Sequence, residues 1–184
     1  MNLGDLRLAD GILQGRTTRL RLARVADAAF IHGLRSDEDR NRYVSAIDAR
    51  VEAQAEWLRR YEEREARGEE YYFVIEHGEV PVGTVRVYDY RGDSFSWGSW
   101  IIAAGTPPAV AMESALLVYE FAFGVLGFKR CHFQVRKGNE RVVAFHKRFG
   151  AVETGGDETS SDFAYTREGY EALRPRYEKF LPQS

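Results

Sequence analysis

The sequence predicts an α+β fold in which a mixed, mostly antiparallel sheet is flanked by helices. Three consecutive runs, residues 71–76, 80–90 and 94–102, are rich in β-branched and aromatic side chains and are separated by turn signals, as in an antiparallel meander. The run 109–126 is almost continuously apolar and long enough for a buried helix. This order of helices, a meander, a buried helix and further strands is typical of α+β proteins.

The other elements are expected on both sides of this central part. Residues 18–24 alternate leucine with arginine or alanine, which indicates a strand with one buried face, and residues 1–16 form an arm or a short edge element before it. Helices are expected at 26–36 and at the strongly charged 51–67. After the apolar run we expect a strand at 130–135, an amphipathic helix at 139–149 ended by Gly150, short strands around 151–154 and 162–166, and a helical segment at 168–180.

Composition and charge favour one domain, residues 17–184, after the arm 1–16. A net charge of −2 with interspersed signs gives no footprint for nucleic acid or an anionic membrane. The single cysteine, Cys131, excludes a disulfide framework and a multi-cysteine metal site, and we interpret it as a buried, inert thiol. The beginning of the chain lacks the pattern of a secretion signal, so a cytoplasmic location is expected. No bound metal is expected either.

An anion site is predicted where the third meander strand leads into the apolar helix. A helix N-terminus offers unpaired backbone N–H groups and the positive end of a dipole. Prolines favour the first helical turn, so Pro107 and Pro108 leave the N–H groups of Ala109, Val110 and Ala111 as candidate phosphate ligands. The alternative is a core helix that starts at proline and binds nothing.

Two segments together resemble the GCN5-related N-acetyltransferase (GNAT) family. The first is the junction just described, where the positions of the family's pyrophosphate-loop pattern fall on Thr106, Ala109 and Ala111, without the usual first residue or first glycine. The second is Asn139-x-x-Val142-x-x-Phe145-His146-x-x-x-Gly150, which is similar to the family's helix beside the thiol end of coenzyme A. The resemblance covers roughly residues 17–166 and implies that acetyl-CoA is bound where the fourth and fifth strands splay apart.

The resemblance also implies roles for individual residues. His146 occupies the position of the family's usual tyrosine acid and could protonate the departing sulfur or act as a base; the alternative is a hydrogen-bonded core histidine. Trp100, Ile101 and Ile102 would flank the pantetheine, with Phe145 nearby, and Asn139 would contact the cofactor or serve as an N-cap. Ser96-Trp97-Gly98 stands where relatives often carry a basic glutamate, so the base is relayed by water, is His146 itself, or is not needed.

The resemblance further implies that the acceptor is a primary amine, bound by the region between the first two helices and by the meander strands. Arginines suit phosphates and aromatic rings suit a base or a sugar, which favours a nucleotide-linked amino sugar. The alternatives are that the aromatic residues belong to the core, that the chain acetylates protein N-termini, or that it binds acyl-CoA without catalysis. Pairing of two copies through an exposed strand is a further hypothesis. The candidate acceptor residues are Arg35, Asn41, Tyr43, Arg86, Tyr88, Trp97 and Trp100.

Overall fold

A computed structural model describes residues 3, 7–36 and 50–182 of the chain. They form one eight-stranded sheet in the order β1-β2-β3-β4-β5-β6-β8-β7. All neighbouring strands are antiparallel except β5 and β6, which are parallel, so the predicted mixed, mostly antiparallel α+β fold is confirmed. The strands are β1 (Ile12–Gln14), β2 (Thr18–Leu22), β3 (Tyr71–His77), β4 (Val80–Arg91), β5 (Ser94–Ile102), β6 (Arg130–Arg136), β7 (Val152–Gly156) and β8 (Ser160–Thr166).

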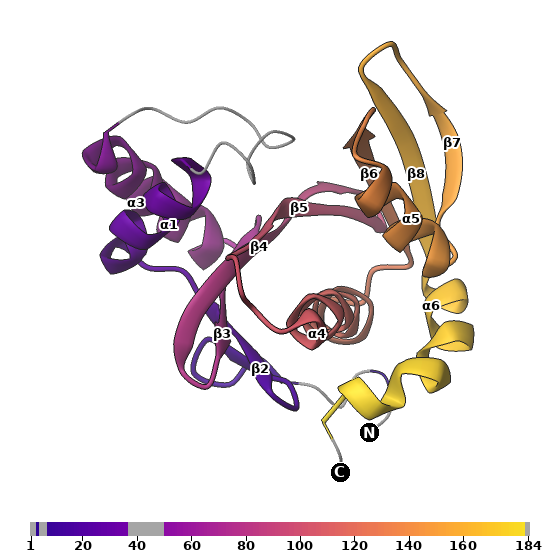
Figure 1. The fold of residues 1–184 in the computed structure, drawn as a ribbon, viewed down its shortest axis with the longest axis horizontal. Helices are drawn as coiled ribbons and strands as arrows, with labels where there is room; N and C mark the ends of the chain where they lie inside the picture. Colours follow the sequence, from indigo (N-terminus) through magenta and orange to yellow (C-terminus); the bar gives the residue numbers. More distant parts are fainter. Residues whose placement is uncertain (1–2, 4–6, 37–49, 183–184) are drawn as a thin grey trace.

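The helices lie on both faces of this sheet. The sheet is arched, α4 runs inside the arch, and α1 and α3 lie on the other face (Figure 1). One window, Pro108–Val125, is long and apolar enough to cross a membrane by composition, but 67% of it is buried inside the protein, as expected of a core helix. The helical elements are η1 (Val25–Asp27), α1 (Ala28–Ser36), α3 (Val51–Ala66), α4 (Pro108–Tyr119), η2 (Glu120–Val125), α5 (Glu140–Arg148), α6 (Arg167–Leu173) and η3 (Arg174–Phe180).

The N-terminal residues contribute the short edge strand that the sequence left open. β1 pairs with β2, and Leu13 in its centre is fully buried. The carboxylate of Glu113 on α4 accepts hydrogen bonds from the backbone N–H groups of Thr17 and Thr18 and from the Thr17 hydroxyl. These bonds tie the β1–β2 turn to the core helix.

Alternation along the strands divides the core between the two faces. The larger cluster contains Phe73, Val85 and Phe95 on the face that α4 covers. The smaller cluster contains Tyr72 and Val74, the strand neighbours of Phe73, on the face that α1 and α3 cover. Because successive side chains of a strand point to opposite sides, one strand can place side chains in both clusters.

The apolar run 109–126 is not one regular helix. It begins as α4 at Pro108 and continues from Glu120 to Val125 as a π-helix, η2. Glu120 is fully buried there, accepts a hydrogen bond from the Tyr170 hydroxyl at 2.6 Å and forms an ion pair with Arg174 at 2.5 Å. The π-helical end of this run therefore holds a buried carboxylate that is bound by Tyr170 of α6 and Arg174 of η3.

Candidate active site

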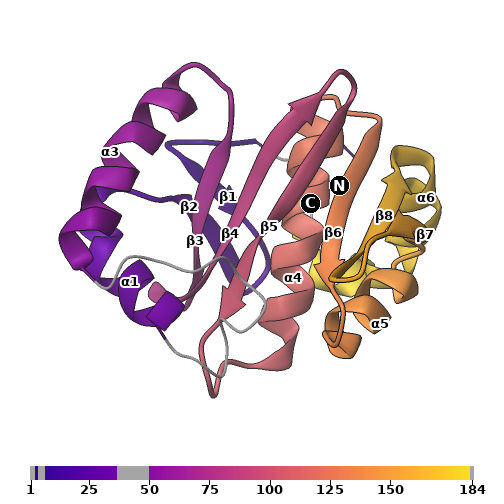
Figure 2. The same ribbon diagram turned by 90° about the horizontal axis from the view of Figure 1, so that it is seen from above.

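Strands β5 and β6 run parallel but pair only at their beginnings. The register joins Ser94 to Arg130 and Phe95 to Cys131, and the described residues of the two strands do not pair beyond that point. Figure 2 shows β5 and β6 separating, with α4 on the far side of the sheet. The splay predicted between the fourth and fifth strands is therefore present, and these strands are β5 and β6 because β1 precedes them.

β5 carries a bulge on its other side, against β4. The register shifts between Gly98 and Ile101, so that Ser99 and Trp100 together stand opposite a single residue of β4. Ser99 has a φ of 48°, and its carbonyl oxygen accepts a hydrogen bond of 2.9 Å from the hydroxyl of Thr84. Backbone groups of β5 that face the separated β6 are consequently available to a ligand at the bulge.

His146 projects from α5 into the same region from the α4 face. Its side chain is buried at 5% exposure, with ring centroids 4.2 Å from Phe133 on β6 and 5.3 Å from Trp97 on β5. The ring atom Nδ1 is buried and has no hydrogen-bond partner, so the alternative of a satisfied core histidine does not describe it. Loss of hydration lowers the pKa of His146 to about 4, and the imidazole is neutral at pH 7.

This low pKa has a consequence for stability. The unfolded chain binds a proton at His146 near pH 6.5, whereas the folded chain does so only near pH 4, so stability is complete above pH 6.5 and falls as the pH drops toward 4. In urea titrations at pH 7 and pH 4.5, we expect His146→Phe to lose about 2 kcal/mol less stability between the two pH values than the wild type. An equal loss in both proteins would contradict the neutral, buried histidine.

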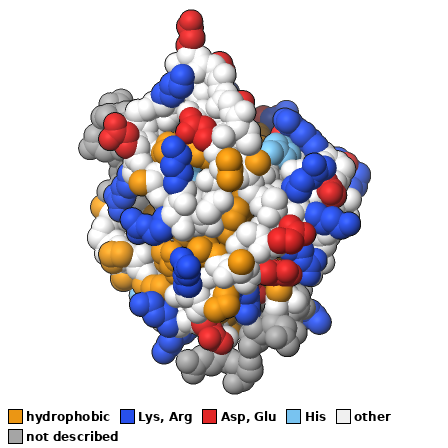
Figure 3. Space-filling model, turned by 90° about the vertical axis from the view of Figure 1, so that its right-hand side faces the viewer, with side chains coloured by type: hydrophobic (Ala, Val, Ile, Leu, Met, Phe, Trp, Pro, Cys, Tyr) orange, Lys and Arg blue, Asp and Glu red, His pale blue; other side chains and the backbone are white. Residues whose placement is uncertain are grey.

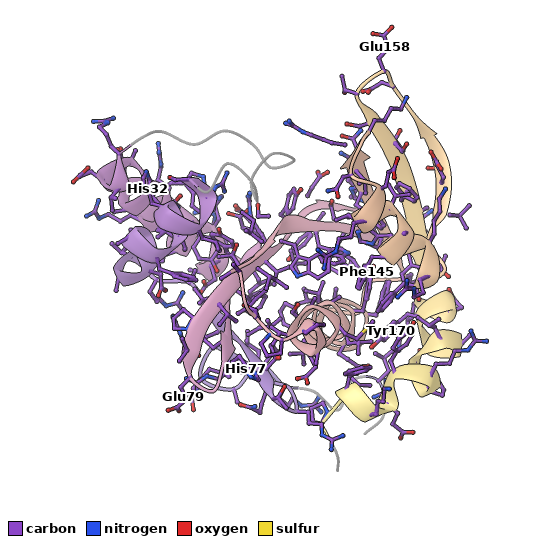
Figure 4. All side chains as sticks on the ribbon, in the orientation of Figure 1. His32, His77, Glu79, Phe145, Glu158 and Tyr170 are labelled. Atoms are coloured by element: carbon purple, nitrogen blue, oxygen red, sulfur yellow. The ribbon has the colours of Figure 1, made fainter. Side chains whose placement is uncertain are left out.

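Aromatic side chains of β5 and α5 surround His146. Trp100 lies 5.0 Å from Phe145, and its indole N–H donates to the Ser114 hydroxyl on α4 at 3.1 Å. Figure 4 shows Phe145 pointing from α5 toward the space between the sheet and α4. The structure therefore brings together three residues predicted to lie near the thiol end of the cofactor, namely Trp100, Phe145 and His146.

Trp97 lies on the wrong face for the predicted acceptor contact. It is 5% exposed on the α4 side, and its indole N–H is 3.3 Å from the Tyr119 hydroxyl. The predicted acceptor residues Arg86 and Tyr88 lie on the α1 and α3 side of β4, as does their strand neighbour Thr84. Trp97 pairs with Val87, the strand neighbour of Arg86 and Tyr88, so strand alternation puts it on the opposite face, where it is a core neighbour of His146.

Arg86 is engaged by the protein and supports Tyr88. Its guanidinium forms hydrogen bonds and an ion pair with the buried carboxylate of Glu70, including an Nε contact of 2.8 Å. It also lies over two rings, 4.6 Å from the centre of Tyr88 and 5.2 Å from that of Trp57. These contacts already occupy the guanidinium, so they do not favour the predicted bidentate binding of a phosphate by Arg86. Instead, it orients the Tyr88 ring.

The Tyr88 hydroxyl lies beside the bulge. The added methyl group of a Gly98→Ala variant would meet this oxygen at 3.1 Å, which places the hydroxyl over the residue just before Ser99. On the same face, Arg35 at the end of α1 lies near the Tyr72 hydroxyl, whose pKa burial raises and Arg35 partly lowers again. The structure thus gathers Arg35, Arg86 and Tyr88 on one face, whereas Asn41 and Tyr43 lie outside the described residues.

The start of α4 differs from the expected anion site. The helix begins at Pro108 with Pro107 as its N-cap, one residue earlier than predicted. The N–H of Val110 donates to the Pro107 carbonyl at 3.0 Å, and Ala111 occupies the fourth helical position, whose N–H normally bonds to the cap carbonyl. Of the three N–H groups predicted to be free phosphate ligands, only that of Ala109 stays a free donor, because the helix begins one residue earlier than predicted.

The remaining predicted cofactor residues lie at the start of α5, before α4 and at the end of β5. Asn139 is the N-cap of α5 and accepts a hydrogen bond from the Val142 N–H, as the alternative interpretation proposed. Thr106 is half-buried in the loop before α4, Ile101 is buried, and Ile102 is half-buried at the end of β5. Their contacts to acetyl-CoA stay predictions.

Sequence reasoning missed two features of this site. The first is Phe133, whose ring is the closest to His146. Its position on the buried face could have been predicted, because side chains alternate along β6 and Cys131, two residues earlier, was interpreted as buried. The left-handed φ of Ser99 had no signal, because serine carries no preference for that conformation. Among the residues that the structure describes, no group of three or more His, Cys, Asp or Glu side chains could hold a metal ion.

Comparisons with known proteins agree with this architecture. A family model described as "Acetyltransferase (GNAT) domain" matches residues 18–152. The solved structure "Apo FdhC- a nucleotide-linked sugar GNAT" is 41% identical, covers 95% of this chain and 100% of its own, and superposes with a TM-score of 0.87. A comparison with curated proteins found no match.

More distant structures share the fold alone. The ribosomal-protein-S5-alanine acetyltransferase from Vibrio fischeri is 13% identical, with a TM-score of 0.73 over 86% of this chain and 98% of its own. A spermidine N-acetyltransferase SpeG mutant from Vibrio cholerae is 19% identical, with a TM-score of 0.68 over 84% of this chain and 96% of its own. The family match over most of the chain and the full-length relative lead to one conclusion: the chain belongs to the GNAT family of acetyltransferases.

Proposed function

We propose that this acyltransferase moves the acetyl group of acetyl-CoA to the amine of a nucleotide-linked amino sugar, by direct transfer in a ternary complex. The observation that carries the proposal is the 41% identity to a nucleotide-linked sugar GNAT over nearly the whole of both chains. Identities of 13% and 19% to the ribosomal-protein and spermidine enzymes give those acceptors no comparable support.

The residues around the bulge fit the thioester end of acetyl-CoA. The β6-facing edge of β5 is unpaired beyond Phe95, so its backbone N–H and C=O groups can bond to the amides of a pantetheine arm. Trp100 and Phe145 provide an apolar wall beside it. A thioester carbonyl at the bulge would be polarised by backbone N–H groups, the kind of stabilisation that acts most strongly in a site shielded from water.

The pKa of His146 restricts what this residue does. With a pKa of about 4, only about one molecule in 10³ carries the imidazolium at pH 7. The neutral imidazole does not readily transfer its proton to another group, although it can donate a hydrogen bond. Since Nδ1 is buried without a partner, we assign the proton to Nε2, because buried unpaired N–H groups are rarer than buried unpaired acceptors. In this assignment His146 donates a hydrogen bond to the developing thiolate, as a neutral electrophile.

The acceptor face is assembled around Tyr88. Its ring is fixed by Arg86, its hydroxyl lies over Gly98 beside the bulge, and the surrounding side chains include both aromatic and polar groups. On the side of the molecule that carries α5, α6 and β8, basic and acidic side chains are interspersed around a group of hydrophobic ones (Figure 3), and the chain as a whole has a net charge of −2. A small anionic amine fits this arrangement better than a nucleic acid.

Two further expectations complete the proposal. We place the reaction in the cytoplasm, because the single cysteine, Cys131, is a buried free thiol, which a reducing compartment preserves. Pairing of two copies is proposed along β7, an edge strand whose five residues are all exposed.

The proposal is tested by thiol release from acetyl-CoA with a panel of amines. The panel contains nucleotide-linked amino sugars, the corresponding free amino sugars, peptide N-termini and polyamines. Its matched blanks are the same nucleotide sugars with a hydroxyl in place of the amine. We expect release with the nucleotide-linked amino sugars alone, and a product whose mass increases by one acetyl group.

Each other outcome replaces the proposal with a defined alternative. Selective release with peptides would assign a protein acetyltransferase, and equal rates with free and nucleotide-linked sugars would remove the nucleotide from recognition. Coenzyme A binding in calorimetry without transfer to any amine would assign a noncatalytic acyl-CoA-binding module.

A further inference from the structure

Three polar side chains from adjacent strands form a hydrogen-bonded chain on the α1 and α3 face of the sheet. Nδ1 of His132 on β6 lies 2.7 Å from the hydroxyl of Ser94 on β5, and Nε2 lies 3.2 Å from a carboxylate oxygen of Asp89 on β4. Asp89 also forms an ion pair with Arg91 at 2.6 Å, and the two neighbours hold the pKa of its carboxyl below the usual range. The carboxylate fixes a proton on Nε2 and leaves the lone pair of Nδ1 toward Ser94.

His132 lies across the sheet from His146. On β6, Cys131 and Phe133 point to the α4 face, where Phe133 contacts His146, so His132 between them points to the opposite face. Phe95 and Cys131 are the last paired residues of β5 and β6, so His132 and Phe133 are the first two residues of β6 beyond the paired segment. The two histidines therefore flank β5 and β6 from opposite sides, just beyond the last paired residues.

Polar groups continue from this cluster toward the bulge. Ser94, Ser96 and Gly98 share one face of β5, and a strand rises about 3.3 Å per residue, so about 13 Å separates Ser94 from Gly98. Tyr88 pairs with Ser96, and its hydroxyl reaches Gly98. The hydroxyls of Tyr88, Ser96 and Ser94 can thus be joined through water into one path from the bulge to His132.

We propose that this path carries away the proton of the acceptor amine and that His132 is its terminal acceptor. The inference rests on the proposed transfer to a primary amine, which enters as an ammonium ion. One ammonium proton passes along the hydroxyls to Ser94, which gives its own proton to Nδ1 of His132, and Asp89 stabilises the resulting imidazolium. The neutral amine then forms the N–C bond as the C–S bond breaks, and its second proton goes to the leaving sulfur.

This arrangement supplies what β5 itself lacks. The strand carries serine, tryptophan and glycine at 96–98 and no carboxylate, and the low pKa of His146 makes that residue a weak base. The charged groups on the face around His132 are Asp89 with its partner Arg91, Arg130 paired with Asp93, and Arg136 and Asp162 farther along β6 and β8. Asp89 is the charged group of this set that contacts the ring.

The test compares kcat/KM against pH for the full-length wild type and His132→Gln, with acetyl-CoA and the amine that the panel identifies. At pH 7 we expect His132→Gln to lose about 100-fold in kcat/KM for the amine, the usual scale for a lost base. The deficit narrows as the pH approaches the pKa of the free amine, because deprotonation by solvent then suffices. KM for acetyl-CoA should stay unchanged, since Trp100 and Phe145, the proposed wall beside the pantetheine, lie on the α4 face and His132 lies on the opposite one.

Two companion variants keep the test decisive. Ser94→Ala interrupts the path while leaving the histidine and the carboxylate in place, and should show the same pH-dependent loss even if His132→Gln folds poorly. Gln134→Ala alters the next exposed side chain on the same face of β6 and should match the wild type.

A loss in His132→Gln and Ser94→Ala that is equal at every pH would overturn the proposal, as would a wild-type profile in both variants. In those cases the wild type still transfers acetyl groups, so the proposed function stands. A wild type that releases no thiol with any amine would instead remove the proposed function and this inference together.

Discussion

Replacing His146 with phenylalanine is expected to lower kcat about 100-fold, the scale seen when one hydrogen-bond donor to a developing negative charge is removed. KM for acetyl-CoA should change little, because the interaction strengthens only as the sulfur becomes a thiolate. Phenylalanine keeps the aromatic contacts with Phe133 and Trp97, so folding is preserved. Steady-state kinetics with the amine from the panel, alongside thermal unfolding, would measure the effect.

His146→Gln is the matched control for this experiment. The terminal amide of glutamine can place an N–H near the position of Nε2, so part of the lost rate should return without any group that titrates near neutral pH. Near-normal turnover by folded His146→Phe would remove this residue from the mechanism. A rate loss that glutamine does not relieve would point to altered packing in place of a missing donor.

Replacing Arg174 with methionine is expected to lower the free energy of unfolding by about 3 kcal/mol at pH 7. The guanidinium is 14% exposed and pairs with Glu120, which is fully buried in η2, so the variant leaves a carboxylate without its counter-charge in the core. Removal of one partner of a buried ion pair typically costs about 3–5 kcal/mol for this reason. Urea unfolding of the single variant against the wild type measures the loss.

The double variant Glu120→Gln with Arg174→Met tests the cause. Glutamine keeps an acceptor for the Tyr170 hydroxyl, which lies 2.6 Å from Glu120 in the wild type, but carries no charge. Stability should therefore recover to within about 1 kcal/mol of the wild type. If the double variant is as unstable as Arg174→Met, lost packing of the arginine stem is the cause and the charge argument is wrong.

Local patterns were sufficient to predict most of the helices and strands. The meander was marked by β-branched and aromatic runs between turn signals, α4 by the length of its apolar run, and α5 by its helical period, and none of these signals needs a distant contact. The same helical period placed Phe145 and His146 on the inner side of α5, and the short polar side chain of Asn139 marked its N-cap. The two GNAT-like segments could be recognised for the same reason, since each lies within a single turn or helix.

Contacts between distant segments decided the chemistry of the site. The pairing of Trp97 with Val87 placed Trp97 across the sheet from Arg86, and Glu70, sixteen residues before Arg86, engaged the Arg86 guanidinium. A bulge arises from a register shift between two strands, so the left-handed Ser99 could not be read from its neighbours in sequence.

The histidines show the same division. Alternation along β6 is enough to put His132 on the face opposite Cys131, but the partners of His132 come from β4 and β5, 43 and 38 residues away. The low pKa of His146 likewise depends on burial by Trp97 and Phe133 from two other strands. Periodicity thus fixes which side of its own element a side chain occupies, whereas its partners, hydration and pKa depend on the other elements that the fold packs against it.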